Sequence, residues 1–306
     1  MLDVVVITGP TASGKTDLSL MLANDLQSEI ISADSRQVYK MMDICTAKPS
    51  KEELSSVNHH LIDFLNPDGE YSAGIFARDA SRVINELSST GKTPIVCGGS
   101  LFYIKALFEG LFDGDSQSTN HELRHQLNKQ CEEQGLEPLL TQLQEVDAVS
   151  YERVDKNNKQ RVIRALEYYL SNNEKLSDAQ KREENNNNFR PIYFAIDFPR
   201  QLLYDRINRR CEQMWEQGIV EEYKQIIDSC YSPNLNSMNT VGYNEVKKFL
   251  EGEWTEGTAI EEFKKFTRRY AKRQLTWLRG MDNVNWLNYD LDNKTKTIKI
   301  KECLNI

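Results

Sequence analysis

The chain has 306 residues, of which 39% are hydrophobic and 27% are charged, with a formal net charge of −8 at pH 7. This composition is typical of an ordinary soluble protein with one large domain or two smaller ones. No stretch approaches 18 uncharged apolar residues, which excludes a transmembrane helix, and the acidic balance disfavours a nonspecific coat on nucleic acid.

The first predicted element is a buried strand at residues 4–8, and Asp17–Leu26 has helical apolar spacing. Because the apolar run leads directly into the next motif, we interpret it as a core strand and not as a signal peptide. Six scattered cysteines without a CxxC pair favour reduced thiols and a cytoplasmic location.

Between this strand and helix lies a phosphate-binding loop, Gly9-Pro10-Thr11-Ala12-Ser13-Gly14-Lys15-Thr16. Its glycines let successive N–H groups turn toward phosphate oxygens, and Lys15 adds a positive charge. The Thr16 hydroxyl is placed to hold Mg²⁺, and the helix N-terminus favours an anion. The strand–loop–helix context predicts a diphosphate or nucleotide site of the kind found in ATP-binding proteins.

Three more strands are predicted, at Glu29–Ala33, Pro94–Cys97 and Pro191–Asp197, with helical patterns between them. We therefore expect an α/β fold with a parallel sheet flanked by helices, similar to P-loop NTPases. The stretch from about Asp113 to Asn188 is helical and polar, and its edges, Asp113–Ser116 and Asn185–Asn188, are predicted to be exposed linkers. The expected domains are a core, 1–112 plus 190–306, and a helical insertion, 113–189.

After the last of these strands the chain is predicted to be helical again, at Arg200–Gln217, Ile219–Ser229, Val241–Leu250 and Thr258–Gly280. His121 and His125 have metal-ligand spacing on a predicted helix. With no nearby cysteine, two surface histidines are the favoured interpretation.

Two short segments follow strand ends and have two interpretations each. Asp34 comes directly after the second strand, where a carboxylate either accepts a proton from a nucleophile near the phosphate or caps the next helix. Ser100 belongs to a Gly-rich turn, Cys97–Tyr103, whose N–H groups and hydroxyl either face the same phosphates or cap a helix. Position alone does not choose between these interpretations.

Two helical segments carry cations. Arg206 and Arg209 lie three residues apart on one helix face, where they either bind phosphate oxygens bidentately or form a solvated face. The segment from Lys264 to Arg279 has seven Lys and Arg residues, no acid, and aromatic residues such as Trp277. This pattern is typical of an RNA surface or of an amphipathic helix with leucines in the core, and both can hold together.

Taken together, these segments resemble the tRNA dimethylallyltransferases, also called tRNA isopentenyltransferases. No C-terminal zinc finger of the eukaryotic kind is present, so the resemblance is to the bacterial or organellar type. The matching stretches run in the family's order at Gly9–Thr16, Ile31–Tyr39, Met42–Pro49, Gly98–Tyr103, Gln160-Arg161 with Arg164–Glu167, Arg206–Arg209, Val241–Tyr243 and Ala271–Gly280.

The resemblance implies transfer of a dimethylallyl group from dimethylallyl diphosphate to N6 of adenosine 37, next to the anticodon. It assigns Asp34 as general base and Lys15, Thr16 with Mg²⁺, Ser100 and Arg209 to the diphosphate. The contacts it implies with a tRNA anticodon stem-loop are Asp34, Ser35, Arg36, Gln37, Gln160, Arg161, Val162, Ile163, Arg164, Asn239, Thr240, Val241, Gly242, Tyr243, Asn244, Lys272, Arg273, Gln274 and Arg279. We expect no membrane, no obligate protein partner and a monomer.

The chain departs from the family pattern at a few positions. Ser100 stands where threonine is usual, Cys45 where glycine is usual, and Asn239 and Asn244 where arginines often flank the Val241–Tyr243 block. Three other functions remain open: a small-molecule kinase, an adenylate isopentenyltransferase acting on free nucleotides, and a non-enzymatic nucleotide-dependent RNA-binding protein. The first two leave the basic Lys264–Arg279 segment without a role, and the third leaves Asp34 and Ser100 without one.

Overall fold

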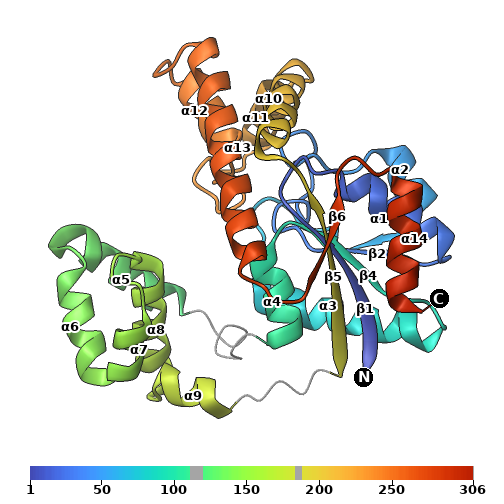
Figure 1. Cartoon of the computed structure of the whole chain (residues 1–306). Coiled ribbons are helices and arrows are strands. Elements are labelled where there is room, and N and C mark those ends of the chain that lie inside the picture. Colours follow the sequence, from blue (N-terminus) through green and yellow to red (C-terminus); the bar gives the residue numbers. More distant parts are fainter. Residues whose placement is uncertain (111–119, 183–187, 306) are drawn as a thin grey trace. The chain divides into compact units, whose positions relative to one another are not determined.

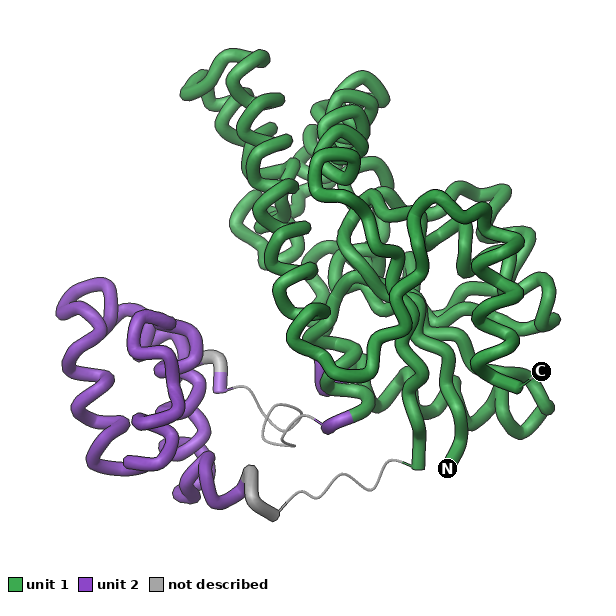
Figure 2. Tube along the Cα trace, viewed as in Figure 1, with its two compact units in different colours: residues 1–71, 76–108, 188–306 green, residues 72–75, 109–187 purple. Residues whose placement is uncertain are grey.

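The computed structural model describes residues 1–110, 120–182 and 188–305 (Figure 1). The chain forms two compact units: unit 1 contains residues 1–71, 76–108 and 188–306, and unit 2 contains residues 72–75 and 109–187 (Figure 2). The linkers predicted at Asp113–Ser116 and at 185–187 lie outside the described residues, as does the predicted domain boundary at 113. No helix in the described parts of the chain is long and apolar enough to cross a membrane.

Unit 1 is built on a six-stranded sheet in which every neighbouring pair is parallel. The strands in spatial order are β3 (His59–His60), β2 (Ile30–Ser32), β4 (Ile95–Gly98), β1 (Leu2–Thr8), β5 (Phe189–Asp197) and β6 (Val284–Asn288). The apolar runs predicted as strands lie in the middle of this order and are buried on both faces, as a parallel sheet requires. The predicted α/β fold is confirmed.

Two strands were missed, and the expectation of only helices after β5 is wrong. β6 pairs with β5 from Tyr193↔Val284 to Asp197↔Asn288, but Leu287 is its only buried residue. β3 has two residues, and neither is fully buried. Both are edge strands, so neither has the apolar pattern by which a buried strand is recognised from sequence.

Helices cover both faces of the sheet (Figure 1). On one face α1 (Lys15–Asp25) and α14 (Asn293–Leu304) pack against Val5 and Ile7 through residues such as Leu22 and Ile300. The alternate residues of β1, Val4 and Val6, are also fully buried. The other face is covered by α3 (Ala73–Ser89) and α4 (Leu101–Glu109), and the short α2 (Lys51–Ser56) precedes β3.

A second core forms where the helices after β5 meet the segment after β2. The segment from Val38 to Cys45 packs in this core against Leu203, Ile207 and Phe263, which come from helices of the C-terminal region. This packing joins the segment after β2 to the helices of the C-terminal region. The helices are α10 (Arg200–Glu216), α11 (Ile219–Asp228), α12 (Tyr243–Leu250) and α13 (Glu256–Arg279), all close to the predicted ranges.

Unit 2 is helical with its own small core, centred on Leu139, Leu143, Val162 and Leu166. Its elements are α5 (His121–Gln134), α6 (Glu137–Val146), α7 (Ala148–Arg153), α8 (Lys159–Asn172) and α9 (Leu176–Arg182). The helical character predicted for this stretch is confirmed over its described residues. Three or more side chains suited to a metal do not come together anywhere in the described residues.

Candidate active site and nucleic-acid interface

Three turns meet at the carboxyl edge of the sheet, where ligands bind in open α/β folds. They follow β1, β2 and β4, which are neighbours in the sheet. The Thr8 hydroxyl donates to the Gly98 carbonyl at 3.0 Å, and the Ser100 N–H donates to the Ala33 carbonyl at 3.1 Å. A Cβ on Gly98 would lie 2.0 Å from the Ala33 oxygen, so only glycine permits this approach. The sheet therefore brings the phosphate loop, Asp34 and Ser100 together, as the sequence predicts.

The phosphate loop has the curled backbone that its motif demands. Gly9, Ala12 and Gly14 have positive φ angles of 144°, 62° and 86°. The Ser13 hydroxyl is buried and has no hydrogen-bond partner among the described residues. Because buried polar atoms are nearly always paired, this hydroxyl fits a loop that is completed by an oxyanion ligand. Lys15 Nζ meanwhile donates to the Pro10 carbonyl at 2.8 Å, which holds the ammonium over the loop.

Lys15 shares its surroundings with one carboxylate and a second cation. Burial lowers the pKa of Lys15 to about 8, Asp34 opposes that shift, and Arg210 adds to it. Burial likewise lowers the pKa of Arg210, and Asp34 is among the groups that raise it. The structure therefore places Lys15, Arg210 and Asp34 within electrostatic reach of one another. We call residues 9–16 together with Asp34, Ser100 and Arg210 the loop site.

The arginines of α10 differ from the prediction. The sequence paired Arg206 with Arg209, but the Arg209 side chain is exposed, whereas Arg210 is partly buried and faces the loop site. Arg206 donates through Nε to the Ala12 carbonyl at 2.8 Å and so braces the phosphate loop. Residues 206 and 210 are four apart and lie on one helix face. The expectation for Arg209 is therefore corrected in favour of Arg210, which spacing alone did not distinguish.

Asp34 is a turn cap, and it retains a second oxygen. Its Oδ1 accepts from the N–H groups of Arg36 at 2.8 Å and of Gln37 at 3.3 Å, so it caps a turn and not the helix that the capping interpretation expected. No described residue donates a hydrogen bond to Oδ2. One oxygen orients the carboxylate while the other remains available, so capping does not exclude a role as base.

Ser100 supports the same turn. Its Oγ accepts from the Ser35 N–H at 2.9 Å and lies 3.3 Å from the Ser35 hydroxyl. The hydroxyl is thus directed at the Asp34 turn and not at the start of α4. On the α13 side, burial raises the pKa of Tyr270 to about 12, and Asp34 adds to the rise. No sequence motif marks Tyr270 as a neighbour of the loop site.

A buried carboxylate, that of Glu222, holds the backbone of the Met42–Pro49 segment. Glu222 accepts from the N–H groups of Asp43, Ile44 and Cys45 at 2.8, 2.6 and 3.0 Å, and from the Tyr243 hydroxyl at 2.7 Å. Tyr243 is fully buried, so its predicted side-chain contact with tRNA is corrected to a role in the core.

Cys45 fits the position where the family usually has glycine. Its backbone does not adopt a positive φ, and its Sγ donates to the Val241 carbonyl at 3.4 Å. A Cβ on the buried Gly242 would lie 2.9 Å from that sulfur, so the two residues pack closely. Gln37 also holds this segment, because its Nε2 donates to the Thr46 and Ala47 carbonyls at 3.1 Å each.

The predicted contacts at 239–244 and at Arg36 are partly engaged within the protein. The Arg36 guanidinium donates to the carbonyls of Asn236 at 2.6 Å and Asn239 at 3.1 Å. Asn244 Nδ2 donates to Asn239 Oδ1 at 3.2 Å. This loop is therefore preorganised beside the Asp34 turn.

In unit 2, the predicted tRNA contacts on α8 include both exposed and buried residues. Gln160 and Arg161 are exposed at the start of the helix. Val162 and Ile163 are 0% and 3% exposed in the core, so their predicted side-chain contacts with tRNA are corrected. Arg164 forms an ion pair with Glu167 at 3.4 Å.

The basic segment of α13 also divides in two. In its first part Lys264 pairs with Glu212 and Glu261 at 2.6 and 2.7 Å, and Lys265 pairs with Glu262. In its second part Lys272, Arg273 and Arg279 are exposed, and their contact with RNA stays a prediction.

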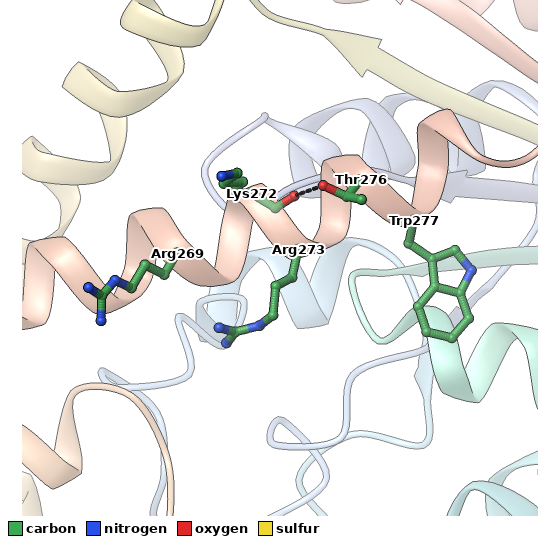
Figure 3. Close-up of a pocket in the computed structure, with 5 residues that line it drawn as sticks. All are labelled: Arg269, Lys272, Arg273, Thr276 and Trp277. Atoms are coloured by element: carbon green, nitrogen blue, oxygen red, sulfur yellow. Dashed lines mark hydrogen bonds between the residues drawn. The ribbon is translucent and has the colours of Figure 1, made fainter. Parts of the chain in front are cut away.

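An open cavity of about 610 Å³ lies against this second part. Arg269, Arg273 and Trp277 are spaced by four residues and point to the same side of the helix (Figure 3). We call this surface the basic face. Its lining residues are Arg269, Lys272, Arg273, Thr276 and Trp277.

The fold and the loop site define a phosphate-loop α/β protein with a basic, aromatic helix beside its site. The family model described as IPP transferase matches residues 37–281. A tRNA dimethylallyltransferase of Acetivibrio thermocellus is 43% identical over 301 residues, covering 97% of this chain and 95% of that protein.

Two solved structures show the same fold. The full-length tRNA isopentenylpyrophosphate transferase of Bacillus halodurans has a TM-score of 0.73 and 36% identity, covering all of this chain and 96% of that one. A eukaryotic dimethylallyltransferase, described as acting on tRNA, has a TM-score of 0.84 and 25% identity, covering all of this chain and 80% of that one. The chain therefore belongs to the IPP transferase family, the tRNA dimethylallyltransferases, which transfer prenyl groups.

Proposed function

We propose that this chain transfers the dimethylallyl group of dimethylallyl diphosphate to the N6 amine of adenosine 37 in tRNA, next to the anticodon. The observation that carries the proposal is the placement of the Asp34 carboxylate within electrostatic reach of Lys15 and Arg210 at the phosphate loop. A proton acceptor and a site for an anionic leaving group are the two functions that such a transfer needs.

The diphosphate is proposed to lie on residues 9–16. In the reaction the bond between the allylic carbon and the diphosphate oxygen breaks, and a bond from N6 to that carbon forms. Negative charge grows on the leaving oxygen, where the loop N–H groups, Lys15 and Arg210 stabilise it. Lys15 is already held by the Pro10 carbonyl, and Arg206 holds the loop through the Ala12 carbonyl, so Lys15 and the loop need little reorganisation in the transition state.

Asp34 is proposed to accept the proton that N6 loses. Adenine N6 is a weak nucleophile, so a base that removes its proton as the new bond forms lowers the barrier. The two N–H bonds to Oδ1 hold the carboxylate, and Oδ2 is proposed to take the proton. Ser100 acts through the Ser35 N–H, by fixing the turn that carries Asp34.

Mg²⁺ is proposed as the cofactor. Its preferred ligands are oxygens, and Thr16, at the start of α1 beside Lys15, offers a hydroxyl in the position that phosphate loops use for this ion. When bound, Mg²⁺ would neutralise part of the diphosphate charge.

The acceptor is proposed to be the anticodon stem-loop of a tRNA, bound by the chain as a monomer. The exposed cations of the basic face suit a phosphate backbone, and Trp277, 40% exposed, suits stacking on an unpaired base. The target adenine must leave its stack to reach the loop site. The names of the relatives favour tRNA over a free nucleotide as acceptor.

The experiment that tests the acceptor position uses synthetic anticodon stem-loops and labelled dimethylallyl diphosphate. Adenosine at position 37 should accept the label, and guanosine at 37, which lacks an N6 amine, should not. A second stem-loop with guanosine at another loop position is the matched control and should retain transfer. Equal labelling of the guanosine-37 stem-loop would contradict the proposal.

A further inference from the structure

We propose that Gln274 is a positioning residue that ties the phosphate loop and the glycine turn after β4 to helix α13, and is not an RNA contact. Its Oε1 accepts from the Thr11 N–H at 2.9 Å, and its Nε2 donates to the Gly99 carbonyl at 2.9 Å. The proposal rests on the proposed function in one respect, since it takes residues 9–16 as the diphosphate site.

Burial separates Gln274 from the neighbouring RNA-contact candidates. It is 5% exposed, whereas Lys272 and Arg273 just before it are exposed. Ala271 and Leu278, three residues before and four after, are fully buried. Residues 271, 274 and 278 therefore form an inward row on α13, while the basic face forms an outward row. The family motif Ala271–Gly280 contains residues of both rows, so the motif alone does not show which of them are buried.

The amide is the side chain that this position requires. Glutamine donates and accepts at once, and the site presents one carbonyl and one N–H. The Gly99 carbonyl also accepts from the Leu101 N–H at 3.1 Å, so loss of the amide removes one of the two hydrogen bonds to this buried oxygen. The Thr11 N–H would be freed at the residue directly before Ala12, whose positive φ of 62° needs support from outside the loop.

Two helices therefore brace the same loop. Arg206 of α10 holds the Ala12 carbonyl, and Gln274 of α13 holds the Thr11 N–H. The loop is proposed to bind the diphosphate in part through its backbone N–H groups, and the positions of these groups depend on the two braces. Loss of the Gln274 brace should weaken diphosphate binding without changing any charge at the RNA surface.

Gly99 offers an independent way to remove the same contact. A Cβ at Gly99 would lie 2.5 Å from Gln274 Nε2 and 3.6 Å from the nearest backbone oxygen. Gly99 does not have a positive φ, so alanine is compatible with its backbone. Gly99→Ala should therefore displace the amide without altering α13.

The test compares wild type, Gln274→Met, Gly99→Ala and the double variant, with the melting temperature confirming that each is folded. Titration calorimetry with inorganic diphosphate, and kcat and KM for dimethylallyl diphosphate, report on the loop. Stem-loop affinity over a range of salt reports on the RNA surface. Each single variant should bind diphosphate about 10-fold more weakly, as expected when the loop loses its hydrogen bond from Thr11 to Gln274, with an unchanged salt slope. The double variant should be no worse than the singles, because both displace the same amide.

The opposite pattern overturns the inference. If Gln274→Met left diphosphate affinity unchanged and reduced stem-loop affinity, Gln274 would be an RNA contact. Additive losses in the double variant would show that Gly99 and Gln274 act separately. Failure of the wild type to bind diphosphate at all would instead contradict the proposed loop site, so the two failures are distinguishable.

Discussion

The loop site and the basic face both carry positive charge, but they hold it in different ways. At the loop site, Lys15 and Arg210 are enclosed and share their surroundings with Asp34. On the basic face, Arg269, Lys272 and Arg273 extend into an open cavity. Enclosed charges interact strongly at fixed positions, whereas exposed charges are screened by water and salt. Under the proposed function, this difference suits the loop site to the transfer step and the basic face to binding a large, flexible polyanion.

The same division runs along α13 itself. Lys264 and Lys265, in the first half of the helix, are paired with glutamates, so little of their positive charge is left uncompensated. Only the later part of the helix keeps exposed cations, and Gln274 on its inner row reaches the phosphate loop. Single substitutions should therefore matter greatly at the loop site, and charge must be removed in groups on the basic face.

The largest expected effect is at Asp34. Asp34→Asn keeps the size of the side chain and an oxygen for the Arg36 and Gln37 N–H groups, but it removes basicity. We expect kcat to fall about 10²–10⁴-fold with stem-loop affinity nearly unchanged. Single-turnover transfer assays and a binding titration measure the two quantities. A near-normal rate would leave Asp34 as a turn cap only.

The next effect separates two adjacent arginines of α10. Arg210→Lys should lower kcat/KM for dimethylallyl diphosphate about 10–100-fold, because a point charge does not reproduce the bidentate guanidinium. Arg209→Lys is the matched control and should change it less than twofold, since that side chain is exposed. Steady-state kinetics on both variants decide the assignment. A larger loss of kcat/KM in Arg209→Lys than in Arg210→Lys would show that Arg209, and not Arg210, belongs to the loop site.

A pH profile should show the enclosed lysine directly. Burial lowers the pKa of Lys15 to about 8, so the free enzyme loses this positive charge as the pH rises through 8. We expect kcat/KM for dimethylallyl diphosphate to fall by up to about tenfold per pH unit above that value. Lys15→Arg does not titrate in this range and should flatten the alkaline limb, whatever its absolute rate. An alkaline limb that persists in Lys15→Arg would assign it to another group.

The smallest effect per residue is expected on the outer surface of α13. Replacing Lys272, Arg273 and Arg279 together by glutamine should weaken stem-loop binding about tenfold and reduce its salt slope by about 2. Diphosphate binding should be unchanged. Three exposed lysines elsewhere in unit 1 provide a control with the same change in net charge: Lys224, Lys294 and Lys299. Equal losses in the two triple variants would mean that overall charge, and not this surface, attracts the RNA.

The parts of the fold that could be predicted are those with strong local signals. The phosphate loop, the four buried strands and the long helices have patterns that depend only on neighbouring residues. The convergence of Asp34 and Ser100 was also predictable, because both follow parallel strands that end at one edge. β6 was not, since its pairing with β5 buries only Leu287 and leaves no apolar pattern.

The misassigned site residues share one cause. The predicted tRNA contacts were contiguous ranges, such as 160–164 and 241–244. Successive side chains of a helix or turn point in different directions, some to the core and some to solvent, so a contiguous range includes core positions. Val162, Ile163 and Tyr243 are buried by tertiary packing that the sequence alone does not report. Arg209 and Arg210 differ by about 100° of helix rotation, and only the packing of α10 shows which one faces Lys15.

The most direct test of the central claim is a transfer assay that offers labelled dimethylallyl diphosphate together with tRNA, AMP and ATP. We expect label in tRNA alone, at the adenosine next to the anticodon, and release of diphosphate in equal amount. Label in AMP or ATP, or phosphate transfer without any prenylated product, would contradict it.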